Sequence, residues 1–168
     1  MRKVEVVKHN PEWRNLFKAE SQTISNILGQ NIVGVHHIGS TAIPYIYAKP
    51  IIDLLVEVNN IEDIDRHNKD MKQIGYQAMG EFGINGRRYF RKDNASGIRT
   101  HHVHIFETSS PQVKRHIAFR DYMLAHPSDA KQYSDLKRKL AQQFPYDIES
   151  YMDGKDEFIK NIDRLAAR

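Results

Sequence analysis

The residues best suited to chemistry lie in two stretches that follow each other closely along the chain. In the first, Gly39, Ser40 and Thr41 follow an apolar segment, and their small size lets backbone amides and two hydroxyls approach an anion. In the second, Asp53 interrupts the apolar run 51–58, where a carboxylate is costly unless it meets a cation, a metal or hydrogen-bond donors. We therefore expect Asp53 to be the catalytic, metal-binding residue and the loop to contact a phosphate.

Two histidines are candidate partners of Asp53 in a metal site. His102 and His104 are two positions apart in a segment expected to be a strand, so both side chains point to one face. With Asp53 they form a two-histidine, one-carboxylate ligand set for Mg²⁺, Mn²⁺ or Zn²⁺, and imidazole suits the last two better. The alternative is that one histidine is a hydrogen-bonded core residue and the other contacts a ligand directly. His37, beside the loop, is also expected to share the pocket.

Three basic residues are candidates for phosphate contacts. Lys49 stands just before the Asp53 strand, Arg88 carries a planar guanidinium that matches phosphate oxygens, and Lys155 lies in an apolar helix stripe. The alternatives are that Lys49 is the exposed start of a strand and that the Lys155 stem packs while its ammonium reaches solvent. The basic run 137–139 is interpreted as a solvated surface, where such runs usually lie.

Composition excludes several functional classes. The 168 residues include 25 Lys and Arg, 21 Asp and Glu and no cysteine, which excludes disulfides, thiol nucleophiles and thiolate-bound metals. The net charge of +4 is spread along the chain, so we expect no nucleic-acid partner. No apolar stretch could span a membrane and no secretory segment begins the chain, so we expect a cytoplasmic protein. Serine-hydrolase, P-loop and dinucleotide-binding motifs are absent, and nothing indicates an oligomeric state.

The elements that position these residues follow from periodicity and turn residues. Apolar residues at helical spacing predict helices over 11–28 and 61–74, and β-branched runs predict strands over 32–38 and 51–58. Antiparallel hairpins and then helices from about residue 110 to the end are expected next. The hairpin strands are expected at 76–82, 87–92 and 99–107. This order predicts a single α+β domain over 1–168, with strands 32–38 and 51–58 as neighbours in a mixed sheet.

The longer pattern resembles the GrpB family of small bacterial proteins, which belongs to the nucleotidyltransferase superfamily. In that superfamily a Gly-Ser loop precedes a strand that carries an Asp-x-Asp pair. The resemblance covers almost the whole chain, through Asn10-Pro11-Glu12-Trp13, His37–Pro44, Ala48–Asp53, Arg88-Tyr89-Phe90, His102-Val103-His104, Ala118–Tyr122, His126-Pro127 and Tyr151 with Lys155. It implies a nucleotidyltransferase-like mixed β-sheet with helices packed on it and a helical C-terminal part.

The resemblance also implies binding of a nucleotide or another phosphorylated small molecule, with metal-dependent nucleotidyl transfer. The carboxylate pair needed to hold two metals is incomplete, however, because Ile51 and Leu55 stand two positions before and after Asp53. Whether the protein is an enzyme therefore stays open. One alternative is a non-catalytic ligand-binding module near coenzyme A metabolism, since family members also occur fused to dephospho-coenzyme A kinase. Another is a metal-dependent phosphoesterase.

Two expectations can be compared directly with coordinates. The first is a single cleft, with Lys49 or Arg88 at its rim, that is lined by Gly39, Ser40, Asp53 and His104. The second concerns stability. If Asp53 is a buried carboxylate without compensation, replacing it with asparagine should leave stability unchanged or raise it.

Overall fold

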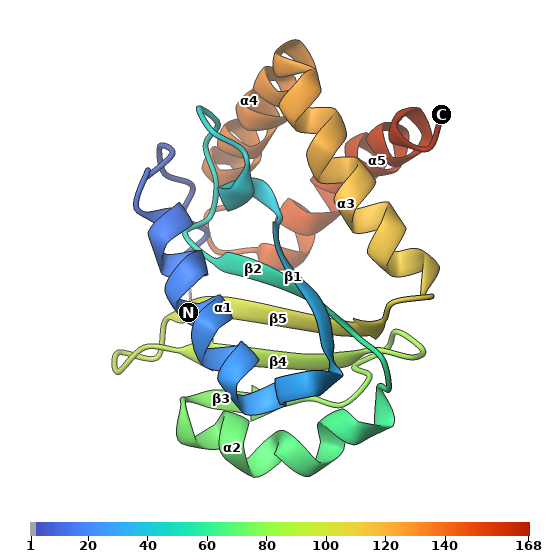
Figure 1. Ribbon diagram of the computed structural model, residues 1–168. Helices are drawn as coiled ribbons and strands as arrows, with labels where there is room; N and C mark the ends of the chain where they lie inside the picture. Colours follow the sequence, from blue (N-terminus) through green and yellow to red (C-terminus); the bar gives the residue numbers. More distant parts are fainter. Residues whose placement is uncertain (1–2) are drawn as a thin grey trace.

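In the computed structural model, which describes residues 3–168, five strands form one mixed sheet. The strands are β1 (Ile32–Ile38), β2 (Ile52–Val58), β3 (Tyr76–Ala78), β4 (Arg88–Asp93) and β5 (Arg99–Glu107). The helices are α1 (Trp13–Leu28), α2 (Asn68–Gln73), α3 (Pro111–Ala125), α4 (Pro127–Gln143) and α5 (Ile148–Ala166), with 3-10 turns η1 (Gly29–Asn31), η2 (Ser40–Ala42) and η3 (Glu62–His67). The sheet order is β1-β2-β5-β4-β3, and only the β2–β5 pair is parallel (Figure 1). The expected α+β fold, with β1 beside β2 and a helical C-terminal part, is confirmed.

The apolar run of β2 is covered on both sides, which explains its almost continuous hydrophobicity. Residues of even number, such as Leu54, pack in a core with α1 and α2. Residues of odd number face the other side, where Leu55 packs with Val113 of α3. Because side chains alternate across a strand, Asp53 is fixed on the α3 side of the sheet.

Two elements are shorter or tighter than expected. The helix predicted over 61–74 begins as the 3-10 turn η3, with Ile64 N donating to the Ile61 carbonyl, and only α2 is α-helical. Its apolar stripe is nevertheless correctly placed, because Ile61, Ile64 and Met71 are buried. The strand predicted to reach residue 82 ends at Ala78, since the chain turns there and Phe82 adopts a positive φ of 49°.

The three C-terminal helices lie together, beyond β2 and away from β3 (Figure 1). They pack on the loop between β1 and β2, where Ile43 and Ile46 are buried in a cluster with Tyr133 of α4 and side chains of α3 and α5. α4 and α5 come very close at Gly154, where an added Cβ atom would lie 2.4 Å from Leu140 Cδ2. Within residues 3–168, none of the helices is both long and apolar enough to cross a membrane.

Candidate metal and phosphate site

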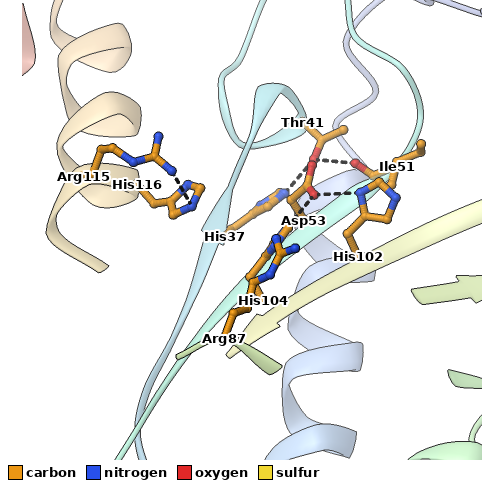
Figure 2. Close-up of polar contacts among 9 residues, drawn as sticks. All are labelled: His37, Thr41, Ile51, Asp53, Arg87, His102, His104, Arg115 and His116. Carbon is orange, nitrogen blue, oxygen red and sulfur yellow. Dashed lines mark hydrogen bonds and ion pairs between the residues drawn. The ribbon is translucent and has the colours of Figure 1, made fainter. Parts of the chain in front are cut away.

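Asp53, His102 and His104 meet on the α3 side of the sheet (Figure 2). The parallel pairing of β2 with β5 sets Asp53 opposite His102, and alternation puts His104 on the same face. His102 Nδ1 lies 3.1 Å, and His104 Nε2 3.3 Å, from Asp53 Oδ1. One ligand atom from each of the three residues lies within 4.8 Å of the other two. The structure therefore brings together the three residues proposed as metal ligands.

The donor set determines which ions fit. Two imidazole nitrogens and one carboxylate oxygen suit Zn²⁺ or Mn²⁺ better than Mg²⁺, which prefers an octahedron of oxygens. His104 Nδ1 also accepts a long hydrogen bond of 3.4 Å from Arg87 Nη1. Binding a metal through Nε2 requires the ring proton on Nδ1, so that contact must then open. Arg87 would keep its hydrogen bonds to the carbonyls of Glu81 and Phe82.

The negative charge of Asp53 is compensated by contacts with His102 and His104, although only 25% of its side chain is exposed. Burial alone raises the pKa of Asp53, but the hydrogen bonds and the electrostatic attraction of His102 and His104 together outweigh burial and hold the pKa well below its usual range. The premise that this charge lacks compensation is therefore wrong. A carboxyl whose pKa is lowered by folding contributes stability above its unfolded pKa of about 3.9, and that contribution is lost as the pH falls through the folded value.

Gly39 lets the loop after β1 lie directly against the Asp53 carboxylate. Its φ of 75° is in the left-handed region that favours glycine. An added Cβ atom would lie 2.6 Å from Asp53 Oδ2, closer than real Cβ atoms approach any neighbour. Two independent constraints therefore require glycine at this position.

Replacing Gly39 with alanine is expected to destabilise the protein by about 1–3 kcal/mol, because the backbone strain and the clash with Asp53 add to each other. Displacement of the carboxylate should also weaken Mn²⁺ binding. Thermal unfolding and metal titration of the variant test both effects, with Gly97→Ala as a control because Gly97 shares the positive φ but has open space around its Cβ. Equal metal affinities in the two variants would contradict the proposed contact.

The two hydroxyls of the loop are engaged in different contacts. Thr41 is 2% exposed, and its hydroxyl is 2.9 Å from His37 Nε2 and donates to the Ile51 carbonyl oxygen. The Ser40 hydroxyl shares a hydrogen bond with that of Tyr133. Thr41 thus holds the loop together instead of facing a ligand, which corrects its predicted role. The ring of His37 belongs to this loop contact and not to the metal cluster, and burial lowers its pKa to about 4.

The structure places two of the three predicted phosphate ligands near Asp53. The Asp53 charge acts on both Lys49 and Lys155, although burial is the larger influence and lowers the pKa of each, to about 8 for Lys155. Arg88 lies on the opposite face of the sheet, with Nε and Nη2 2.7 and 3.2 Å from the Asp65 carboxylate. Of the two residues predicted at the rim of the cleft, Lys49 or Arg88, Arg88 is therefore on the wrong side of the sheet, and its predicted phosphate contact beside Asp53 is wrong in position. Its neighbour Arg87 reaches the His104 side instead.

Sequence reasoning missed side chains that the C-terminal helices bring to the site. Lys137 of α4 is 1% exposed, although its basic run is typical of a surface. His116 of α3 stacks on His104 with ring centres 5.9 Å apart, and burial lowers its pKa to about 3 (Figure 2). Helical periodicity alone does not show which sheet residues a helix will cover, so no local signal identified either residue.

A mixed sheet with a Gly-Ser loop against a strand aspartate is the arrangement expected of a nucleotidyltransferase-like α+β protein. The model of the GrpB protein family matches residues 3–164, and the chain belongs to this family.

Relatives of known sequence or structure agree with this assignment. The chain is 47% identical over 167 residues to the UPF0157 protein YqkA of Bacillus subtilis, covering 99% of this chain and 48% of YqkA, so it spans about half the length of that relative. It is 36% identical to the glutamate-rich protein GrpB of Alkalihalophilus pseudofirmus, covering 94% of this chain and 92% of that protein. A crystal structure of the conserved protein GrpB from Enterococcus faecalis superposes with a TM-score of 0.93 at 46% identity, over 96% of each chain.

Proposed function

We propose that the protein holds one divalent metal ion on Asp53, His102 and His104 and uses it to bind a nucleotide or another phosphorylated small molecule. The observation that supports this proposal is the convergence of three ligand atoms within 4.8 Å on one face of the sheet. A metal held by one carboxylate keeps most of its charge for phosphate oxygens, so the ion supplies electrostatic attraction when bound. Gly39 keeps the loop close to that centre.

The site supports one metal better than the two that nucleotidyl transfer uses. Leu55, where a second carboxylate would stand, is completely buried in an apolar cluster. Glu57 shares the face of Asp53, but its carboxylate is bonded to His36 and Thr108. We therefore propose ligand binding as the main function and expect any nucleotidyl transfer to be slow.

Mn²⁺ and Zn²⁺ are expected to bind at least about tenfold more tightly than Mg²⁺, because two of the three donors are imidazole nitrogens. Calorimetric titration of each ion into protein freed of metal with a chelator measures the three affinities. Mg²⁺ binding as tight as that of Mn²⁺ would mean that the histidines are not ligands. His36→Asn is a suitable control, since His36 is bonded to Glu57 and lies outside the cluster.

The class of ligand can be tested with ATP in the presence and absence of Mn²⁺. We expect ATP to bind more tightly with Mn²⁺, since the phosphates would be held partly through the ion. Binding without turnover supports a binding module, and release of pyrophosphate would add nucleotidyl transfer. Release of inorganic phosphate from phosphate esters would instead indicate a phosphoesterase. ATP binding that is insensitive to Mn²⁺ would contradict the proposal.

One observation favours a second candidate, an accessory role in coenzyme A metabolism. Proteins named dephospho-CoA kinase from Mycobacterium leprae and Mycolicibacterium paratuberculosis match 96% and 97% of this chain at 24% and 25% identity, and the match covers 46% of each. In this alternative the phosphorylated ligand would be dephospho-coenzyme A. If dephospho-coenzyme A binds much more tightly than ATP in the same kind of titration, the accessory role in coenzyme A metabolism is favoured.

A further inference from the structure

Three lysines from distant parts of the chain are gathered at one place. Lys49 precedes β2, Lys137 belongs to α4 and Lys155 to α5. The ammonium groups of Lys49 and Lys155 lie 5.6 and 4.9 Å from the centre of the Tyr151 ring. Lys137 Nζ lies 4.4 Å from the centre of the Tyr133 ring and is repelled by both other lysines. The three amino groups therefore form one lysine cluster beside two aromatic rings.

Among the described residues, this lysine cluster lacks a matching negative charge. Lys137 and Lys155 are only 1% and 8% exposed. Within the described part of the chain, neither Lys137 Nζ nor the Tyr151 hydroxyl has a hydrogen-bond partner. Among residues 3–168, the lysines that form ion pairs are Lys92, Lys131 and Lys160. Lys137 and Lys155 are thus held out of water without a carboxylate in salt-bridge distance among the described residues, an arrangement that is costly unless an anion binds.

Asp53 does not neutralise this cluster. The Asp53 charge attracts Lys49 and Lys155 electrostatically, but its Oδ1 atom is already hydrogen-bonded to His102 and His104. A metal ion on Asp53 would add further positive charge to the same region. The balance of charge therefore calls for a ligand with more than one negative charge.

We propose that Lys49, Lys137 and Lys155 form a binding site for a diphosphate or triphosphate group, next to the Asp53 centre. This inference rests on the proposed function, because it names the part of the phosphorylated ligand that the protein recognises. The anion site itself does not need the metal. Lys49 is the partly exposed member of the cluster, while Lys137 and Lys155 are its buried, inner members.

The charge states of Lys137 and Lys155 support the proposal. Burial, together with repulsion from Lys155 and Lys49, lowers the pKa of Lys137 to about 6. Burial and repulsion from Lys49 lower the pKa of Lys155 to about 8, with Asp53 opposing the change. Burial raises the pKa of Tyr133 and of Tyr151, whose rings lie beside these lysines, so both hydroxyls stay neutral. An arriving anion favours the charged form of Lys137, and binding near neutral pH is expected to take up protons.

The test is calorimetric titration of inorganic pyrophosphate into chelator-treated protein near neutral pH. Wild-type protein is expected to bind pyrophosphate about tenfold or more tightly than inorganic phosphate, and Lys137→Met to bind pyrophosphate about tenfold or more weakly than wild type. Lys139→Met is the matched control, because Lys139 is exposed on the same helix. The proposal is overturned if wild type does not prefer pyrophosphate, or if the Lys137 and Lys139 variants bind it equally well.

Two further measurements keep the interpretation clear. Lys155→Met should weaken pyrophosphate binding as Lys137→Met does, and circular dichroism checks that both variants are folded. Titration in two buffers of different ionisation enthalpy should show proton uptake by wild type and less by Lys137→Met. Equal uptake in the two would contradict the role given to Lys137.

Asp53→Asn separates this inference from the proposed function. In the presence of chelator it should bind pyrophosphate at least as tightly as wild type, while its Mn²⁺ binding is lost. Pyrophosphate binding in a protein that takes no Mn²⁺ would refute the metal-dependent function alone. Mn²⁺ binding without pyrophosphate binding would refute the anion site alone.

Discussion

Asp53→Asn is expected to weaken Mn²⁺ binding by about 100-fold or more, because the amide removes the only anionic ligand of the three. ATP affinity in the presence of Mn²⁺ should fall with it. Glu57→Gln is the matched control, since Glu57 lies on the same strand and face but is bonded to His36 and Thr108. Calorimetric titrations of the two variants and of wild type measure the difference directly.

The same titrations at lower pH test the histidines. The Mn²⁺ affinity of wild type should be lower at acidic pH than at neutral pH, because protons compete with the metal for imidazole nitrogens. Equal affinities of wild type and Asp53→Asn at both pH values would remove Asp53 and the histidines from the metal site. A non-catalytic, metal-independent binding module would then be the better interpretation.

Lys137→Met is expected to stabilise the protein by about 1–4 kcal/mol in the absence of ligands, because an apolar side chain of similar volume replaces a buried amine that folding holds away from its charged form. The pKa of Lys137 is lowered to about 6 by folding, from about 10.4 when unfolded, so the unfolded state binds more protons between these values. Lys137 therefore destabilises wild type most at and below about pH 6, and this destabilisation fades as the pH rises toward 10.

Urea unfolding of wild type, Lys137→Met and Lys139→Met at several pH values checks this prediction. The exposed Lys139 should change stability by no more than about 0.5 kcal/mol. The gain from Lys137→Met should shrink as the pH rises. A variant that is less stable than wild type at neutral pH would mean that Lys137 has a stabilising partner in the metal-free protein.

That His102 and His104 share a face was predictable because strand periodicity is strict, whereas the pairing of β2 with β5, which brings them to Asp53, was not. Asp53, His102 and His104 lie in clear strand segments, and a period of two fixes which residues share a face. The same rule could not assign the face of Arg88, because Arg87 and Arg88 are adjacent and the turn before β4 decides which of them points toward Asp53. In the segment 61–74, the apolar stripe predicted from helical spacing is buried, but the first half of the segment is a 3-10 turn and not an α-helix.

Of the three clustered lysines, Lys137 was hidden from sequence reasoning. Lys155 stands out in the sequence because it interrupts an apolar stripe, but Lys137 belongs to a basic run that is typical of a solvated helix face. Its burial depends on how α4 crosses α5, and the local pattern does not encode that contact. Gly154, where Leu140 approaches most closely, is the residue that permits it.

The division of the site between sheet and C-terminal helices has a consequence for synthesis on the ribosome. All three proposed metal ligands precede the end of β5 at Glu107, whereas Lys137 and Lys155 emerge only with α4 and α5. A nascent chain that ends at β5 would carry every metal-ligating side chain but neither inner lysine, and the loop residues Ile43 and Ile46 would lack their helical partners. Selection for diphosphate groups would therefore be acquired later in synthesis than the side chains proposed to hold the metal.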